Sequence, residues 1–328
     1  MQKLKFGVEL PQGGQSFKEI QSLANKAEEL EYSSFFVNDH FFFSNEPYLE
    51  CWTVLSSLIS TTEKIRLGAL VICNSYRDPA LLAKMASTFD NLSGGRLEFC
   101  IGAGWHDKEY RAYGYPFPKP NIRVSQLEEA VQIIKAMWTK EKPQYKGKHY
   151  WINKAISYPK PVQKPHPPIT IGVGHGKRIL RLAAEHGNGF NKSGSPEEYA
   201  ETVKRFDTYC MKANKNPSTM LKSVQTLLVI DQDSSKVAKI AKQNLKKKAS
   251  YSNIKSALKN PGTALKYLSS MISPSNSTIG IVGTPDQCIR RVQKYLDAGA
   301  NYIILTMPSV NAEQSIELFA KDVIPSFN

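Results

Sequence analysis

The chain has 328 residues, a net charge of +14 and five cysteines that form no CxxC pair. Cysteines in odd number and without metal-ligand spacing predict neither a disulfide framework nor a zinc site, which fits a reducing compartment. No apolar run approaches the roughly 20 residues of a membrane-spanning helix. We therefore expect a cytoplasmic protein with no membrane partner, and we expect residues 1–328 to form a single domain, as α/β barrels of this length commonly do.

The positive charge is concentrated between residues 236 and 266, a segment that includes Lys246, Lys247 and Lys248. Clustered lysines neutralise phosphates, so a nucleic-acid surface is one interpretation. No aromatic-interleaved RNA motif and no helix-turn-helix spacing accompanies them. We favour a solvated helix face, keep contact with an anionic small ligand as the second interpretation, and expect no nucleic-acid partner.

The first half of the chain alternates strand and helix patterns. Short apolar segments predict strands over residues 4–10, 34–37, 65–73 and 96–101. Apolar residues at helical spacing predict helices over residues 17–30, 49–59, 79–92 and 124–138. A segment rich in Tyr, Pro and Gly separates the fourth strand from its helix, which indicates an insertion there.

The second half repeats the alternation after a proline-rich excursion, residues 140–168, which predicts a small hairpin. Strands are expected over residues 169–173, 189–191, 221–230 and 300–306. Helices are expected over residues 179–186, 196–209 with Ser195 as N-cap, 285–297 and 312–323. Eight such units, with a Lys- and Ser-rich insertion over residues 231–277, predict a (β/α)8 TIM barrel with insertions after strands four and seven. The missing GxGxxG fingerprint disfavours a Rossmann sheet.

Residues 93–110 form the most informative stretch of the chain. A Gly-Gly turn leads into an apolar strand, and that strand ends directly in Gly102-Ala103-Gly104, followed by Trp105 and His106. Ligands of barrel enzymes bind at the carboxyl ends of the strands. The stretch therefore predicts part of a binding site, although the sequence assigns no role to His106 or to Glu109.

Polar residues follow several of the predicted strands. Because barrel sites are assembled from several strand ends, this convergence predicts a site, whereas each residue alone could be a structural hydrogen-bond partner. The set comprises Asp39 and His40 after strand two, Cys73 and Asn74 after strand three, Gly104, Trp105 and His106 after strand four, and Gly174, His175, Lys177 and Arg178 after strand five.

The residue spacing also bears on the chemistry of this site. No HxH or HExxH pair and no GxSxG elbow is present, so we expect neither a metal centre nor a serine hydrolase. The segment 172–176 leads into a helix start with Lys177 and Arg178, and amide donors beside positive side chains suit an anion. A plain strand-to-helix turn is the alternative interpretation.

Five segments in order along the chain resemble the bacterial luciferase-like superfamily, and most closely its F420-dependent oxidoreductase branch. They are residues 38–41 (NDHF), residues 67–71 (LGALV) with 74–79 (NSYRDP), residues 93–96 (SGGR) with 102–105 (GAGW), residues 159–163 (PKPVQ) with 167–169 (PPI), and residues 280–285 (GIVGTP).

The resemblance implies that coenzyme F420 lies at the carboxyl ends of the strands. It implies a bulge in strand three, often with a non-prolyl cis peptide, near Leu70 and Val71. It also implies that His40 handles the proton that accompanies hydride transfer. The further residues that the resemblance places along the cofactor are Asp39, Cys73, Asn74, Ala103, Gly104 and Trp105, with Gly174, His175, Lys177 and Arg178 at its phosphate.

Two positions depart from the F420-dependent sugar-phosphate dehydrogenases. Trp105 stands where those enzymes carry a carboxylate, and Ser44 replaces their aromatic residue four places after the histidine. These departures argue against a sugar-phosphate substrate, and the surrounding aromatic residues indicate a small apolar or aromatic substrate. An FMN-dependent monooxygenase of the same superfamily and a catalytically silent flavin-binding barrel are the alternatives, and a homodimer is the expected assembly.

Overall fold

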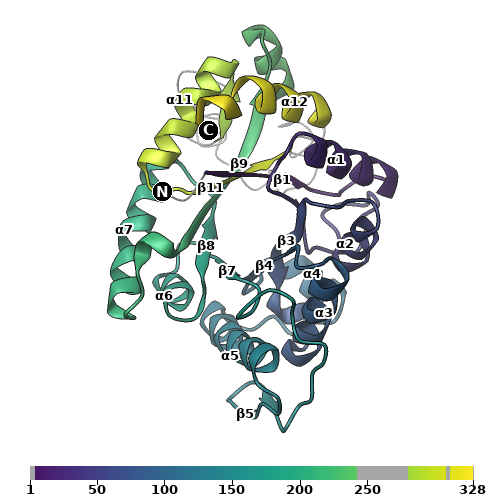
Figure 1. Ribbon diagram of the computed structural model, residues 1–328, viewed down its shortest axis with the longest axis vertical. Coiled ribbons are helices and arrows are strands. Elements are labelled where there is room, and N and C mark those ends of the chain that lie inside the picture. Colours follow the sequence, from purple (N-terminus) through teal and green to yellow (C-terminus); the bar gives the residue numbers. More distant parts are fainter. Residues whose placement is uncertain (1–3, 242–279, 308–310, 328) are drawn as a thin grey trace.

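The computed structural model describes residues 4–241, 280–307 and 311–327. Eight parallel strands close into a barrel, with helices outside them (Figure 1). The ring runs in the order β1 (Lys5–Leu10), β2 (Ser34–Val37), β3 (Arg66–Cys73), β4 (Leu97–Gly102), β7 (Ile169–Gly172), β8 (Gly189–Lys192), β9 (Leu221–Ile230) and β11 (Tyr302–Thr306). The β11 strand pairs with β1, and β8 pairs with β9, which closes the ring. The predicted (β/α)8 barrel is confirmed.

The helices that follow the strands bury one apolar face each against the outside of the barrel. They are α1 (Phe17–Glu29), α2 (Cys51–Ile59), α3 (Pro79–Leu92), α5 (Pro120–Thr139), α6 (Lys177–His186), α7 (Pro196–Lys212), α11 (Pro285–Asp297) and α12 (Ala312–Asp322). In α1 the buried residues Ile20, Leu23, Ala24 and Ala27 recur at helical spacing. Ser195 caps α7 by accepting a hydrogen bond from the Glu198 amide at 3.3 Å, as predicted.

Among the α-helices and strands, the largest differences from the sequence prediction concern three elements. A short helix, α4 (Asp107–Ala112), lies within the insertion after β4, and α5 begins at Pro120 instead of residue 124. Proline is favoured in the first turn of a helix because its missing N–H would have no partner there. A three-residue strand, β10 (Ile281–Gly283), extends the sheet beside the end of β9.

The proline-rich excursion contains the predicted hairpin, formed by β5 (Tyr145–Lys146) and β6 (Trp151–Ile152). The insertion expected after strand seven, with Lys246, Lys247 and Lys248, falls mostly on residues 242–279 and so lies outside the described residues. Among the described helices, none has the length and apolar character needed to cross a bilayer.

The third strand carries the irregularity that the resemblance implies. The pairing register of β3 with β4 shifts between Ala69 and Ile72, and the peptide bond between Leu70 and Val71 is cis. Gly102 and Gly172 flank this bulge, because a Cβ on either would come within 2.8 or 2.9 Å of a Val71 methyl group. The two glycines, at the ends of β4 and β7, therefore allow Val71 of the bulged strand to pack closely against the backbone of both strands.

Candidate active site

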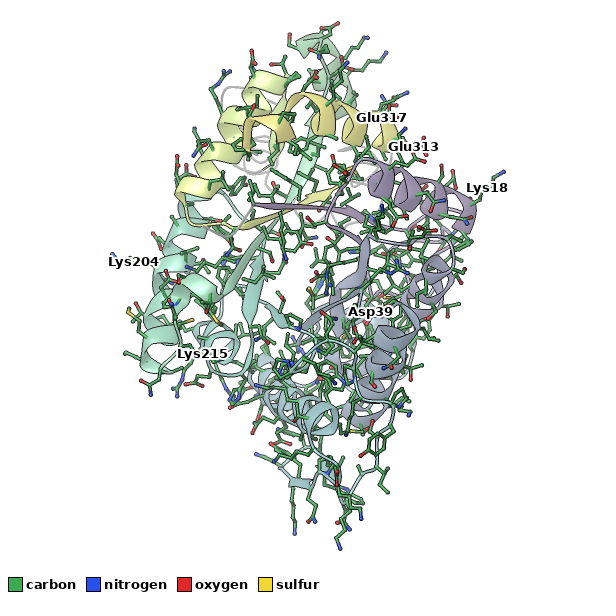
Figure 2. All side chains as sticks on the ribbon, in the orientation of Figure 1. Lys18, Asp39, Lys204, Lys215, Glu313 and Glu317 are labelled. Carbon is green, nitrogen blue, oxygen red and sulfur yellow. The ribbon has the colours of Figure 1, made fainter. Side chains whose placement is uncertain are left out.

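Asp39, directly after β2, ties the end of that strand to the end of β3. Its Oδ2 accepts hydrogen bonds from the Cys73 amide at 2.9 Å and from Arg77 at 2.7 Å, and its Oδ1 accepts a second bond from Arg77 at 3.0 Å. The side chain is buried, and Figure 2 shows Asp39 inside the helical layer, whereas Lys18 and Lys204 reach the periphery. Asp39 is thus committed to protein partners, and its predicted contact with a cofactor stays a prediction.

Glu109, on α4, is the centre of the site, and the sequence prediction missed it. Its Oε1 accepts hydrogen bonds from the amides of Phe41 at 2.5 Å and Phe42 at 3.1 Å. Its Oε2 lies 2.7 Å from Nδ1 of His40 and accepts a bond from the Tyr76 hydroxyl at 2.9 Å. The Glu109 side chain is fully buried, so the loop after β2 is wrapped around one carboxylate.

The environment of Glu109 keeps this carboxylate ionised. Burial alone would raise its pKa, but the hydrogen bonds from His40 and from the amides of Phe41 and Phe42 outweigh burial and lower the pKa to about 2. An anion at this position favours a proton on Nδ1 of His40 and leaves Nε2 as the ring nitrogen that can exchange a proton with a substrate.

Aromatic rings surround His40. Its ring centroid lies 4.4 Å from that of Phe43, 5.6 Å from that of Trp105 and 5.8 Å from that of His106. Trp105 is 65% exposed although it lies against these rings. A large apolar side chain that stays accessible beside a buried histidine–carboxylate pair suits contact with an apolar or aromatic guest.

Cys73 and Tyr110 pack against the turn at Gly104. The Cys73 sulfur is 3.1 Å from the Tyr110 hydroxyl, and Gly104 has φ of 76°, where a Cβ would collide with that hydroxyl. Burial raises the pKa of the Cys73 thiol to about 11, so this thiol is neutral at physiological pH. Cys73 therefore offers a small apolar contact and no thiolate nucleophile.

Asn74 differs from its neighbours in having an unsatisfied atom. Its amide nitrogen is 3.4 Å from the Tyr150 hydroxyl, while its Oδ1 is buried without a hydrogen-bond partner among the described residues. An orphaned acceptor of this kind is costly unless something donates to it. A hydroxyl group of a bound molecule would satisfy it.

A polar layer spans the barrel close to the bulge. The side-chain amide nitrogen of Asn38 donates to Glu9 Oε1 at 2.6 Å and to the carbonyl oxygen of Leu70 at 3.2 Å. Gln225 donates to Glu9 Oε2 at 2.6 Å, and Thr306 also donates to that oxygen. The network joins four strands to the bulged residue. Asn38 follows β2 and belongs to the segment 38–41 on which the resemblance rests, whereas Glu9, Gln225 and Thr306 lie within strands and were not predicted.

The loop after β7 lines a separate cavity of about 260 Å³ between α6 and α7. The predicted residues Gly174, His175 and Lys177 contribute to it, and so does Lys192, which is only 7% exposed and was not predicted. Arg178 does not line this cavity, because it bonds Asn121 and Glu128 of α5, each at 3.0 Å. Glu197, Glu198 and Glu201 form part of the opposite wall.

The predicted residues are thus distributed over two places. Asp39, His40, Cys73, Gly104 and Trp105 gather around Glu109 and the end of β3, and the loop 174–177 lies at the α6–α7 cavity. A signal for Glu109 was its place five residues after Gly104, in the segment that follows a predicted strand end. Lys192 carries a weaker signal, a charged residue that ends an otherwise uncharged strand.

Fold and site together define a (β/α)8 barrel with a buried histidine–carboxylate pair at the carboxyl ends of its strands, which is where barrel enzymes bind their ligands. Residues 3–302 match the family described as luciferase-like monooxygenase, and the chain belongs to that family.

Known relatives within this family use two kinds of cofactor. The F420-dependent glucose-6-phosphate dehydrogenase of Amycolatopsis mediterranei is 24% identical over 322 residues, which cover 94% of each chain. The FMNH(2)-dependent dimethylsulfone monooxygenase of Pseudomonas putida is 25% identical, with 84% of this chain and 78% of the relative covered. An F420-dependent secondary alcohol dehydrogenase, solved with an F420-acetone adduct, superposes with a TM-score of 0.85 at 21% identity and covers 99% of both chains. The relatives support an oxidoreductase.

Proposed function

We propose that this protein is an F420-dependent oxidoreductase that transfers a hydride between the deazaflavin and a small apolar or aromatic substrate. The observation that carries the proposal is His40, held through Nδ1 by the ionised Glu109 at the strand ends and enclosed by aromatic rings. Alcohol and carbonyl chemistry by hydride transfer requires one positioned proton donor or acceptor, and His40 supplies it.

The residues around the bulge fit a tricyclic cofactor with a hydroxylated chain. The buried Oδ1 of Asn74 has no hydrogen-bond donor among the described residues. Gly102 and Gly172 carry no side chain beside Val71, which leaves the bulge uncrowded. Asn74, Ala103 and Gly104 would hold the chain. The loop 174–177 and Lys192 would hold a phosphate at their side of the cavity that they share with Glu197, Glu198 and Glu201 of α7, whereas Arg178 lies outside that cavity.

F420, when bound, supplies or accepts the hydride at its ring. In the oxidation direction His40 takes the hydroxyl proton as the hydride leaves the substrate carbon, and in the reduction direction it returns that proton to the carbonyl oxygen. Glu109 stabilises the charged imidazole and fixes its orientation. Phe43 and Trp105 exclude water from one side of this histidine.

The substrate class follows from the wall of the site. Trp105 and Ser44 are the departures that argue against a sugar phosphate, but Glu109 brings a carboxylate to His40 from α4. The lack of a carboxylate at position 105 is therefore no evidence against a sugar-phosphate substrate. Support for an apolar or aromatic substrate comes from the aromatic rings around His40 and, for the second departure, from Ser44. We propose a secondary alcohol or ketone with apolar substituents.

An FMN-dependent monooxygenase is the second candidate. It is supported by the description of the family and by the dimethylsulfone monooxygenase relative. The F420-dependent relative, which the chain matches over 94% of its length, favours the first candidate.

Titration of the purified protein with F420 and with FMN, followed by fluorescence, distinguishes the candidates. We expect F420 to bind at least tenfold more tightly, and we expect bound F420 to be reduced by one member of a panel of secondary alcohols. Preferential binding of FMN would favour the monooxygenase. Tight F420 binding without hydride exchange in either direction on the panel would favour a catalytically silent barrel and contradict the proposal.

A further inference from the structure

The described residues contain one cluster that the hydride-transfer proposal uses only in part. His40, His106 and Glu109 place three potential ligand atoms within 4.8 Å of one another. Nδ1 of His40 lies 2.7 Å and Nδ1 of His106 lies 2.9 Å from the same oxygen, Oε2 of Glu109. The sequence predicts no metal centre, because it contains no HxH or HExxH pair. The cluster instead joins His106-x-x-Glu109 to His40, a histidine from another strand end.

The contact between His106 and Glu109 lacks the geometry of a hydrogen bond. Nδ1 of His106 is a buried atom without a hydrogen-bond partner among the described residues, although a carboxylate oxygen lies 2.9 Å away. A nitrogen that approaches an anion closely and donates no proton to it resembles a ligand whose cation is missing. Two imidazoles and one carboxylate are the ligand set that suits zinc and divalent iron, cobalt or nickel.

Two of the three separations between ligand atoms can be compared with those around a metal ion. Ligands at about 2.1 Å from a cation are about 3.0 Å apart when they meet at right angles and about 3.4 Å apart in a tetrahedron. The two separations from Oε2 of Glu109, 2.7 Å to His40 and 2.9 Å to His106, are close to the value for ligands that meet at right angles. Small outward shifts of the two rings would admit the cation, and its remaining positions would be open to water.

The surroundings of Glu109 support this geometry. The amides of Phe41 and Phe42 hold its Oε1, which leaves Oε2 as the oxygen that faces the rings. The Tyr76 hydroxyl, 2.9 Å from Oε2, is a further orienting group. Fixed outer partners of this kind raise the metal affinity of a ligand, because they remove the cost of orienting it.

We propose that His40, His106 and Glu109 form a binding site for a divalent transition-metal ion. The cation takes the place of the proton on Nδ1 of His40, and that proton is released to solvent.

Zinc uptake by the cofactor-free protein tests the proposal without reference to F420. The chelator-treated wild type is titrated with Zn²⁺ in competition with a chromophoric indicator, and Co²⁺ substitution reports the ligand field by visible absorption. We expect one equivalent to bind, and we expect the His106→Ala and His106→Gln variants to bind at least tenfold more weakly. His149→Ala, in the β5–β6 hairpin, is the matched control and should bind like the wild type.

The outcome is decisive in either direction. Absence of stoichiometric zinc uptake by the wild type would overturn the proposal, and so would unchanged uptake by both folded His106 variants. Because no cofactor is present in this titration, a failure here leaves the F420 proposal standing, and a failure of F420 binding leaves the metal site standing.

Discussion

At the scale of single residues, the site depends on one buried anion. Glu109 binds two backbone amides, one tyrosine hydroxyl and one histidine, so its carboxylate both shapes the loop after β2 and sets the charge next to His40. Asp39, by contrast, is held by Arg77, and Nδ1 of His106 lies 2.9 Å from the same carboxylate without the geometry of a hydrogen bond. His40 is therefore the histidine that Glu109 orients by a hydrogen bond through Nδ1, which leaves its Nε2 for proton exchange.

Replacing His40 by asparagine tests this assignment. Asparagine can keep a hydrogen bond to Glu109 but cannot exchange a proton, so we expect turnover to fall by about 100-fold or more, in line with general acid–base catalysis. The F420 dissociation constant, measured by fluorescence titration, should change less than threefold. An unchanged turnover rate with intact cofactor binding would show that His40 has no role in proton transfer.

At the scale of elements, the length of a helix or strand determined whether the sequence predicted it. The long amphipathic helices and the apolar strands were predictable, because their periodicity extends over many residues. The α4 helix has six residues and β10 has three, too few to establish a period. Since α4 carries Glu109, the central carboxylate of the site was missed together with its helix, whereas His40 and Cys73 could be predicted from their positions after strands.

The hairpin formed by β5 and β6 is anchored to α5 by another buried carboxylate. Glu129 accepts hydrogen bonds from the amides of Lys148 at 2.9 Å, His149 at 2.9 Å and Tyr150 at 3.0 Å. Burial raises its pKa, but these amides outweigh burial and leave the pKa below the ordinary value of 4.5. The stabilisation is therefore present above the unfolded-state pKa and is lost as the pH falls through the lower, folded-state pKa.

Substitution of Glu129 by alanine should release the hairpin. We expect a loss of about 2 kcal/mol of local stability, the order of magnitude for hydrogen bonds to a charged group. Amide hydrogen exchange at residues 148–150 should accelerate at neutral pH, and the wild type should approach the variant as the medium is acidified through the folded-state pKa of Glu129, which lies below 4.5. Glu141→Ala, at an exposed position, is the control. Equal protection of the three amides in Glu129→Ala and wild type would contradict this account.

At the scale of the whole molecule, the expected homodimer requires an apolar face outside the barrel. Leu81 and Leu92 of α3 are 55% and 67% exposed. The excursion after the hairpin runs beside this helix, because Asn91 bonds the Lys160 carbonyl at 2.8 Å, and it exposes Tyr158 by 55% and Val162 by 48%. Large apolar side chains gathered on one face commonly mark an interface.

We therefore expect the protein to be a dimer that buries the exposed face of α3. Light scattering during gel filtration should give twice the chain mass of 36.7 kDa. The double variant Leu81→Glu and Leu92→Glu should give the mass of one chain. In a two-fold symmetric interface each introduced carboxylate would lie buried near its counterpart on the other chain, and the two negative charges would repel each other. Met211→Glu, at a 61% exposed position on α7, should leave the dimer intact. A folded double variant that remains dimeric would place the interface elsewhere, and a monomeric wild type would exclude a dimer.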